Sequence, residues 1–222
     1  MTLAGPPELP RFYGDVLGLP LDGDAIRIGE TVLRFAPRDG GPFYHFALLV
    51  PGDRFDAALG WTRGRVELLG GVFDFDAWDA EAVYFHDPAG NIVELIAHHG
   101  VAENGRSGEL AAEELVGLSE LGIVGDPPGL LRSLETAGLA LWDGSAEGEN
   151  TLAFVGERAR TLILAPAGRG WLPTGRPAEP HPVTAGLAVP NRTDLVTVCY
   201  LLDPGAADAG TPVPAELVTV CY

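Results

Sequence analysis

The stretch VYFHDPAGNIVEL, residues 83–95, carries the strongest structural signal in the chain. Two apolar runs, Ala82–Phe85 and Ile92–Ala97, flank the segment Asp87-Pro-Ala-Gly-Asn91. Asp, Pro, Gly and Asn all favour tight turns, while the flanking runs are rich in residues that favour strands. The stretch therefore predicts a β-hairpin over residues 82–97.

Toward the N-terminus, apolar periodicity predicts two helices among several strands. The first helix is expected to stop at Gly18, because glycine commonly follows the last turn of a helix. The expected elements are a helix at Leu9–Leu17, strands at Ala25–Gly29, Thr31–Ala36 and Tyr44–Val50, a helix at Asp53–Thr62 and a strand at Val66–Leu69.

Beyond the hairpin, residues 101–116 are polar and acidic and predict a linker that runs into a short helix. A second unit follows over residues 117–189. Its expected elements are a strand at Gly117–Val124, a helix at Pro128–Ala137, strands at Leu139–Trp142, Leu152–Val155 and Thr161–Ala165, a loop at Gly168–Pro182 and a strand at Val183–Val189. The order strand–helix–strand–strand–strand thus recurs at least twice, which indicates an α+β fold of βαβββ units, residues 1–100 and 117–189.

Residues 190–222 form an atypical tail in which the hexapeptide Leu-Val-Thr-Val-Cys-Tyr occurs twice, at Leu195–Tyr200 and Leu217–Tyr222. Each copy is uncharged and has high β propensity, so each favours pairing with another strand. Three interpretations stay open. One copy adds an edge strand to the body while the other frays, the two copies pair as a hairpin, or a copy is a ligand carried in cis.

Composition excludes several classes of function. The formal net charge is −17, and a chain this acidic repels a phosphate backbone, so no nucleic-acid partner is expected. No apolar run approaches the roughly 18 residues that span a bilayer, and residues 1–10 lack the features of a secretory signal, so no membrane association is expected. The two cysteines, Cys199 and Cys221, lack zinc-binding spacing and fit a reducing, cytoplasmic compartment.

Two residues stand out as chemically unusual for their surroundings. Glu94 lies inside the apolar strand Asn-Ile-Val-Glu-Leu-Ile-Ala, and His45 begins the apolar strand His-Phe-Ala-Leu-Leu-Val. A buried carboxylate must pair, take up a proton or bind a cation, because burial of a bare charge costs several kcal/mol. One imidazole and one carboxylate suit a divalent cation such as zinc, manganese or iron. The alternative is that His45 is a structural strand-end residue and Glu94 faces solvent.

Three segments occur in the order and spacing of glyoxalase-like and fosfomycin-resistance-like proteins. They are FYGDVLGL at residues 12–19, YHFALLVP at residues 44–51 and the opening stretch at residues 83–95. Over residues 9–100 the chain therefore resembles the vicinal-oxygen-chelate superfamily. A longer likeness, through the RGWLPTGRPAE segment at residues 169–179, is to two-part bacterial members of unassigned function and reaches about Val189.

The resemblance implies paired βαβββ modules that form curved mixed sheets with helices outside. It also implies that His45 and Glu94 are ligands of a divalent metal, which would be zinc, manganese, iron or nickel. Family members carry a further ligand His on a strand before the first helix, but the sequence predicts no strand and contains no His over residues 1–5. The metal site is therefore expected to be incomplete, with an N-terminal truncation, His98, or a partner chain in a homodimer as ways to complete it.

The second predicted unit shows no matching ligands, since Ser119 stands where His45 would and residues 161–165 contain no acid. Catalytic residues remain unassigned. Two functions follow from the resemblance. One is a metal-dependent enzyme that acts on a small oxygenated molecule as a lyase or isomerase, a thiol transferase toward an antibiotic, or a dioxygenase. The other is a non-catalytic protein that binds or sequesters a small molecule.

Overall fold

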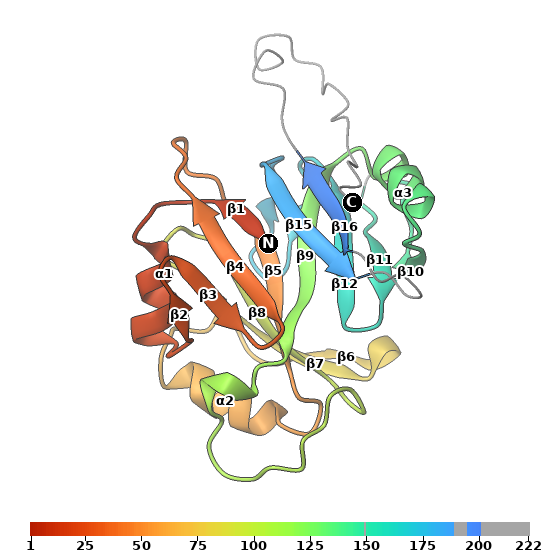
Figure 1. Cartoon of the computed structure of the whole chain (residues 1–222). Coiled ribbons are helices and arrows are strands. Elements are labelled where there is room, and N and C mark those ends of the chain that lie inside the picture. The colour runs from red at the N-terminus through yellow and green to blue at the C-terminus, as the bar shows by residue number, and fades with distance from the viewer. Residues whose placement is uncertain (149, 189–194, 201–222) are drawn as a thin grey trace. The chain divides into compact units, whose positions relative to one another are not determined.

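The chain repeats one order of elements three times (Figure 1). This computed structural model describes residues 1–148, 150–188 and 195–200. The first repeat contains β1 (Thr2–Ala4), α1 (Leu9–Arg11) continued by the π-helical turn η1 (Phe12–Val16), β2 (Leu21–Asp22), β3 (Ala25–Ile28) and β4 (Thr31–Ala36). The second contains β5 (His45–Val50), α2 (Phe55–Arg63), β6 (Phe73–Phe75), the 3-10 turn η2 (Asp76–Trp78), β7 (Ala80–His86) and β8 (Ile92–His98).

The third repeat contains β9 (Gly117–Gly125), α3 (Pro127–Thr136), β10 (Leu141–Gly144), β11 (Ala153–Glu157) and β12 (Arg160–Pro166). The remaining elements are the 3-10 turn η3 (Ala112–Glu114) before β9, the short strands β13 (Gly170–Trp171) and β14 (Arg176–Pro177), and β15 (Val183–Ala188) and β16 (Leu195–Tyr200). The fold is α+β with curved mixed sheets, as predicted. In the described residues, no helix is both long and apolar enough to cross a membrane.

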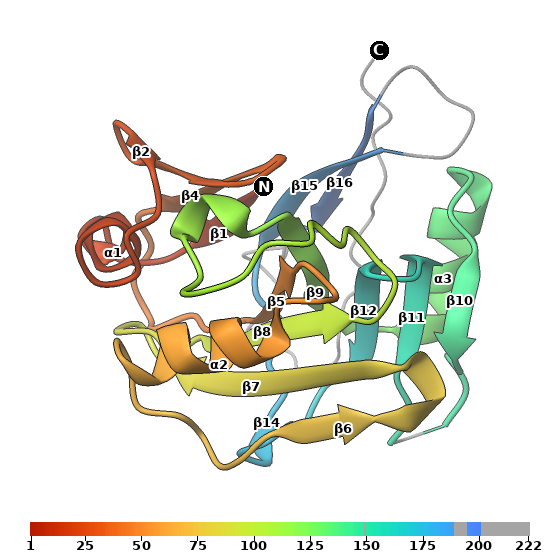
Figure 2. The same ribbon diagram turned by 90° about the horizontal axis from the view of Figure 1, so that it is seen from below.

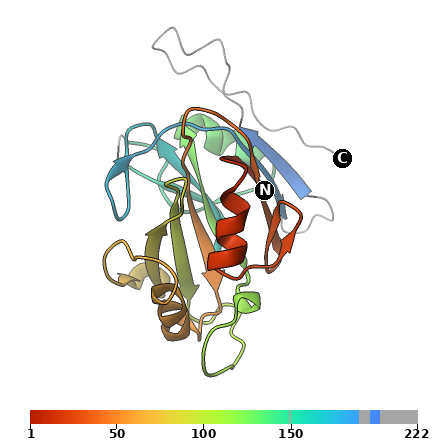
Figure 3. The same ribbon diagram turned by 90° about the vertical axis from the view of Figure 1, so that its left-hand side faces the viewer.

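The contacts divide the chain into two compact units, Gly5–Leu121 and Met1–Ala4 together with the chain from Gly122 onward. In the Gly5–Leu121 unit, the strands run in the order β9-β5-β8-β7-β6, and β4, β3 and β2 are neighbours in a second sheet. β5 and β8 are parallel, and β7 pairs antiparallel with β8. Figure 2 shows α2 lying along β7 and β8, with which it is in contact, and Figure 3 shows α1 beside β4.

Every residue of β5 and of β8 is buried. Strands that are covered on both faces read as continuous apolar runs, which is how both of these strands read in the sequence. The runs Tyr44–Val50 and Ile92–Ala97 were predicted as strands for this reason, and both predictions are confirmed. The core of this unit therefore lies on both sides of the β5–β8 pair.

In the other unit, β10, β11 and β12 form an antiparallel succession, and α3 contacts β11 and β12. β15 pairs antiparallel with both β1 and β16. The first copy of the repeated hexapeptide is β16, and all six of its residues pair with β15, as the edge-strand interpretation predicts for one copy. The second copy, Leu217–Tyr222, lies outside the described residues.

Two sequence predictions require correction. A strand is present at Thr2–Ala4, where none was predicted, because its pairing partners Val183 and Thr184 are remote in sequence and three residues show no periodicity. The strand predicted at Val66–Leu69 is reduced to one isolated bridge at Leu68. The backbone N–H groups of Arg65 and Val66 both bond to the carbonyl of Thr62, which holds this segment to the end of α2 and away from a ladder.

The segment over residues 101–116 is anchored by the buried side chain of Arg54. Its guanidinium group lies 3.2 Å from a carboxylate oxygen of Glu114 and donates to the carbonyls of Arg106, Gly108 and Glu109, each at 3.1 Å. A guanidinium group offers five donors in a fixed fork, which matches this set of acceptors. This segment is therefore packed against the loop that precedes α2.

Candidate metal centre

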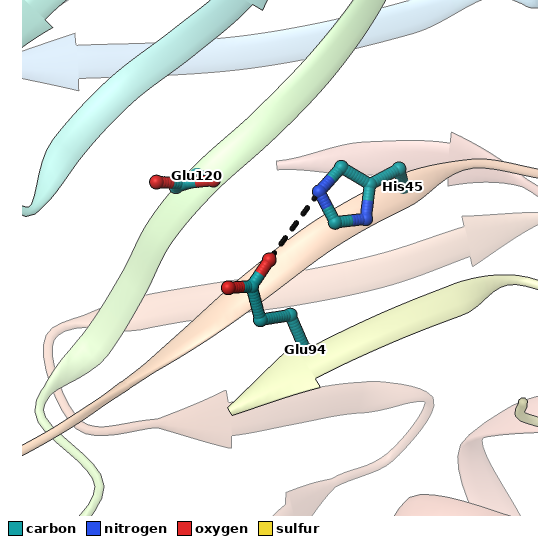
Figure 4. A group of neighbouring side chains, drawn as sticks. All are labelled: His45, Glu94 and Glu120. Carbon is teal, nitrogen blue, oxygen red and sulfur yellow. Dashed lines mark ion pairs between the residues drawn. The ribbon is translucent and has the colours of Figure 1, made fainter. Parts of the chain in front are cut away.

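Three buried ligand-type side chains meet in the Gly5–Leu121 unit (Figure 4). His45 is the first residue of β5, Glu94 the third of β8 and Glu120 the fourth of β9. One ligand atom from each lies within 4.8 Å of the others. The exposed fractions are 5% for His45, 2% for Glu94 and 4% for Glu120, so water contributes little to their solvation.

Strand register explains why these residues converge. Ala47 on β5 lies opposite Glu94 on β8 and opposite Glu120 on β9, so both acids project from the same face as Ala47. His45 lies two residues before Ala47 and shares that face. Ser119 is an extra residue where the β5–β9 register shifts, between the Ala47–Glu120 and Leu48–Leu118 pairs. This bulge presents Glu120 to the site.

Hydrogen bonding fixes the tautomer of His45. Its Nδ1 lies 3.1 Å from the carbonyl oxygen of Ile92, and a carbonyl only accepts, so Nδ1 carries the proton. Nε2 then faces a carboxylate oxygen of Glu94 at 3.5 Å. When one ring nitrogen of a histidine donates its proton to a backbone carbonyl, the other ring nitrogen can bind a metal. This arrangement is found around metal-ligating histidines.

Both carboxyl groups are shifted toward their protonated forms. Burial raises the pKa of Glu94 well above its usual range, the neighbouring charge of Glu120 raises it further, and a hydrogen bond with Tyr84 acts in the opposite direction. Burial raises the pKa of Glu120 to about 8. The pKa of the Tyr84 hydroxyl is raised by burial and by the charges of Glu94 and Glu120. At neutral pH the carboxyl groups of Glu94 and Glu120 therefore hold protons, which a bound cation would displace.

The donor set fits a divalent cation. One imidazole nitrogen and two carboxylates match the ligands of catalytic zinc sites and of manganese and iron sites. Metal–ligand bonds of about 2.0–2.1 Å at tetrahedral angles would hold two ligand atoms roughly 3.3 Å apart. The His45–Glu94 separation of 3.5 Å already agrees with this distance. Two carboxylates this close repel when both are ionised, and a cation removes that repulsion.

Aromatic side chains continue along the same face. Alternation places His98 on the face of Glu94, and the ring of Trp78 stacks on His98 at 6.3 Å between centroids. Phe75 stacks on Trp78 at 5.5 Å, and Phe73 meets Tyr84 edge-on at 5.1 Å. Phe73, Phe75 and Trp78 are half-buried, so their rings present some apolar surface to solvent. Of the three, Phe73 is linked to the candidate centre through Tyr84, which bonds to Glu94.

Comparison with solved structures identifies the fold, although no protein-family model and no curated protein matches the sequence. A "putative dioxygenase" from Bacillus subtilis is 18% identical, with 92% of this chain and 80% of that chain covered and a TM-score of 0.52. Glyoxalase I from Zea mays is 14% identical over 91% of this chain and 86% of that chain, with a TM-score of 0.49. The chain has the vicinal-oxygen-chelate fold.

A Nocardioides "glyoxalase/ bleomycin resistance protein/ dioxygenase" is also similar, at 19% identity over 49% of this chain and 87% of that chain, with a TM-score of 0.37. The vicinal-oxygen-chelate resemblance that the sequence predicted is confirmed as a likeness of fold by the Bacillus subtilis structure, with its TM-score of 0.52.

The sequence predicted that His45 and Glu94 form part of a metal site, and the structure brings the two side chains together. Metal binding itself stays a prediction. His98, considered as a substitute ligand, lies on the expected face but is not in the group of three. His86 lies at the hairpin turn, where its Nδ1 contacts the carbonyl of Asn91 at 3.3 Å.

Sequence reasoning missed Glu120, a candidate ligand at the start of the second predicted unit, where none was expected. The comparison with His45 selected Ser119, one position earlier, because the bulge was not visible in the sequence. A signal was nevertheless present. Glu120 interrupts the apolar run of residues 117–124 just as Glu94 interrupts its own strand. The same rule, an acid inside an apolar strand, would have found both residues.

Proposed function

We propose that His45, Glu94 and Glu120 bind one divalent cation and that the protein is a metal-dependent enzyme for a small molecule with two adjacent oxygens. The observation that carries this proposal is the convergence of three ligand atoms, all from buried side chains, within 4.8 Å. Without a cation, two neighbouring buried acids must hold protons to avoid repulsion. The arrangement is therefore costly for a purely structural cluster and suitable for a metal centre.

The residues of the chain have separable tasks in this proposal. His45, with its Nδ1 proton committed to Ile92, offers Nε2 as a neutral ligand. Glu94 and Glu120 supply negative charge that balances a divalent cation, and Tyr84 orients the Glu94 carboxylate through its hydrogen bond. Such a cation would act as a Lewis acid toward substrate oxygens. Zinc, manganese, iron and nickel all accept imidazole and carboxylate ligands, so the donor set alone selects none of them.

The half-buried rings of Phe73, Phe75 and Trp78 favour a second candidate, a binding protein without catalysis. Aromatic rings beside a polar centre would hold an apolar or planar part of a ligand, whether or not its oxygens react. Both candidates share the centre at His45, Glu94 and Glu120. They differ in turnover, which a direct assay separates.

Calorimetric titration of chelator-treated protein with Zn²⁺, Mn²⁺, Fe²⁺ and Ni²⁺ tests the proposal. We expect one cation per chain for at least one of these metals and proton release on binding. Absence of stoichiometric binding at pH 8, where about half of the Glu120 carboxyl groups have lost their proton, would refute the metal centre.

The loaded protein would then be incubated with three substrate classes, an α-oxoaldehyde with a thiol, an epoxide with a thiol, and a catechol with dioxygen. Turnover that disappears in Glu94→Gln supports the enzyme. Saturable binding without turnover supports the binding protein. If none of these ligands binds or reacts while the metal does bind, the assignment to these three classes is wrong.

A further inference from the structure

The alignment of β5 with β8 presents a physical problem that their apolar residues do not solve. Both strands are buried along their whole length. In a strand with one apolar face, a slip by one residue exposes apolar side chains, and this penalty fixes the register. A strand that is apolar on both faces carries no such penalty. The position of Glu94 opposite Ala47, on which the candidate centre depends, therefore needs another determinant.

A buried polar network at the start of both strands supplies a specific alignment. The side-chain oxygen of Asn91 accepts from the backbone N–H of Tyr44 at 2.8 Å. The backbone N–H of Ile92 donates to the carbonyl of Tyr44 at 2.8 Å. The Nδ1–H of His45 donates to the carbonyl of Ile92 at 3.1 Å. Three hydrogen bonds thus join residues 44–45 to residues 91–92, and a slip would break all of them.

Asp87 holds Asn91 in the orientation that this alignment requires. One carboxylate oxygen of Asp87 accepts from the side-chain amide of Asn91 at 2.7 Å, and the other accepts from the backbone N–H groups of Ala89 and Asn91, both at 3.0 Å. Since the Asn91 amide nitrogen is committed to Asp87, its oxygen must face Tyr44. Asn91 is fully buried, so no water competes for these bonds.

Tyr13 anchors this network to the first repeat. Its hydroxyl donates to Asp87 at 2.7 Å across 74 residues of sequence, and its ring is fully buried. Tyr13 lies in η1, a π-helical turn. Such turns are rare and are often retained where they present a side chain to a functional site. The ring also stacks on Phe35 at 5.8 Å, which fixes the direction of the hydroxyl.

We propose that Tyr13, Asp87 and Asn91 are positioning residues that set the register of β5 against β8 and hold His45 as a ligand with its Nε2 toward Glu94. The inference rests on the proposed metal centre for its purpose. None of the three residues belongs to the candidate ligand group of His45, Glu94 and Glu120. Each acts through His45, whose ring orientation and tautomer depend on the carbonyl of Ile92, the residue next to Asn91.

Imidazole ¹⁵N NMR on metal-free protein tests this inference without reference to activity. The wild type is expected to show His45 as a single Nδ1–H tautomer. Asn91→Ala is expected to mix the two tautomers of His45, and Tyr13→Phe, which removes one hydroxyl, is expected to do so to a smaller degree. The matched control is Thr62→Val, which removes a fully buried hydroxyl bonded to the Ala58 carbonyl at 2.7 Å in the same unit. This control should leave His45 unchanged.

Metal titration gives a second readout. Loss of an outer partner of a ligating residue typically weakens metal binding about 10- to 100-fold, which is the range expected for Asn91→Ala. Tyr13 lies one hydrogen bond further from the ligand, so Tyr13→Phe is expected to lower the metal affinity several-fold. Thr62→Val should bind the metal as tightly as the wild type does.

The two proposals can fail separately. If the wild type binds no metal, the proposed function fails. The NMR measurement of the His45 tautomer still tests whether the network orients His45. If Asn91→Ala does not fold, Tyr13→Phe carries the test, because it keeps the buried ring. The inference is overturned if Tyr13→Phe lowers the melting temperature as Thr62→Val does but leaves the His45 tautomer as in the wild type.

Discussion

The second and third repeats share one order of elements but differ in what their strands carry. In the second, the first strand supplies His45 and the last supplies Glu94. In the third, the first strand supplies Glu120, and the last strand, β12, contains no acid. The scaffold therefore does not require a ligand at either position. The candidate ligands are additions to strands that the fold would form in any case.

The hairpin turns of the repeats also differ, in their length and in the hydrogen bonds that they carry. Between β7 and β8, the turn over residues 87–91 carries the hydrogen bonds of Asp87 and Asn91. Between β11 and β12, the pair Glu157–Arg160 encloses just two residues, Arg158 and Ala159. The first repeat, where Ile28 pairs with Thr31, is also closed by two residues. The longer polar turn thus accompanies the repeat that presents two of the candidate ligands, as expected if this turn positions them.

The largest expected effect comes from giving β12 the acid that it lacks. Ile163→Glu places a carboxyl group in a site that is 2% exposed, with Phe154 as its cross-strand neighbour. Glu94 has Tyr84 and His45 as partners, and the new acid would have neither. We expect destabilisation of about 4 kcal/mol or more by urea unfolding. Ile163→Met, which keeps the volume and adds no charge, should cost less than about 1.5 kcal/mol.

If Ile163→Glu cost no more than Ile163→Met, partner groups would not explain why β8 tolerates an acid, and the contrast between the repeats would lose its physical basis.

The same contrast shows which features a sequence can predict. Residues 44–50, 82–85 and 92–97 were predicted as strands because apolar runs and turn residues are local properties. The pair His45 and Glu94 was found because polar residues inside apolar runs are conspicuous. In both cases the information lies within a few residues of chain.

The features that were missed depend on distant partners. β1 is three residues long and is defined by pairing with β15, some 180 residues later. The place of Glu120 depends on a bulge at Ser119, which is a property of how two strands pair. The strand predicted at Val66–Leu69 has suitable residues but is retained at the end of α2 by bonds to Thr62. Such pairings are not encoded in local periodicity.

Metal affinity should depend on Glu94 of the second repeat and not on Glu157 of the third. Glu94→Gln removes a carboxyl group that could ionise and bind the cation, and we expect the affinity of the protein for the preferred cation to fall by at least about 100-fold, more than loss of an outer partner costs. Glu157→Gln removes an exposed acid from β11 and should leave the affinity unchanged. Isothermal titration of both variants at pH 8 provides the measurement. Equal affinities in the two variants would exclude Glu94 as a ligand.

The pH dependence of stability should reveal the raised pKa of Glu120 in the folded protein. An unfolded glutamate loses its proton near pH 4.3, whereas the folded pKa of Glu120 is raised to about 8. Between these values the folded state holds the extra proton, so the free energy of unfolding of metal-free protein should fall as pH rises. One such group contributes a slope of at most about 1.4 kcal/mol per pH unit.

Glu120→Gln should reduce this slope by the contribution of Glu120, while Glu94 keeps its own, and should make the metal-free protein more stable than wild type at pH 8. Melting temperatures measured from pH 5 to pH 9 for both proteins check the expectation. The exposed Glu157→Gln variant should keep the wild-type slope. A slope that is the same in all three proteins would mean that the pKa of Glu120 is not raised in the folded state.

The smallest expected effect concerns the two turns. Gly90 adopts φ +79° in the long turn, and Ala159 adopts φ +66° in the short one. A Cβ in this left-handed region costs roughly 1–2 kcal/mol, so Gly90→Ala should destabilise the protein by about that amount. Ala159→Gly relieves the same strain but removes a buried methyl group and increases the freedom of the unfolded chain.

These contributions oppose each other at Ala159, so this variant should stay within about 0.5 kcal/mol of wild type in urea unfolding. Metal titration should distinguish the two variants further. Gly90→Ala strains the turn that holds Asn91 and should weaken the metal centre as well as the fold, whereas Ala159→Gly should change neither. Because Gly90 donates its N–H to the carbonyl of Asp87 at 2.9 Å, strain at Gly90 reaches the residues that orient Asn91 directly. Unchanged metal affinity in a measurably destabilised Gly90→Ala would show that the turn supports the fold without positioning His45.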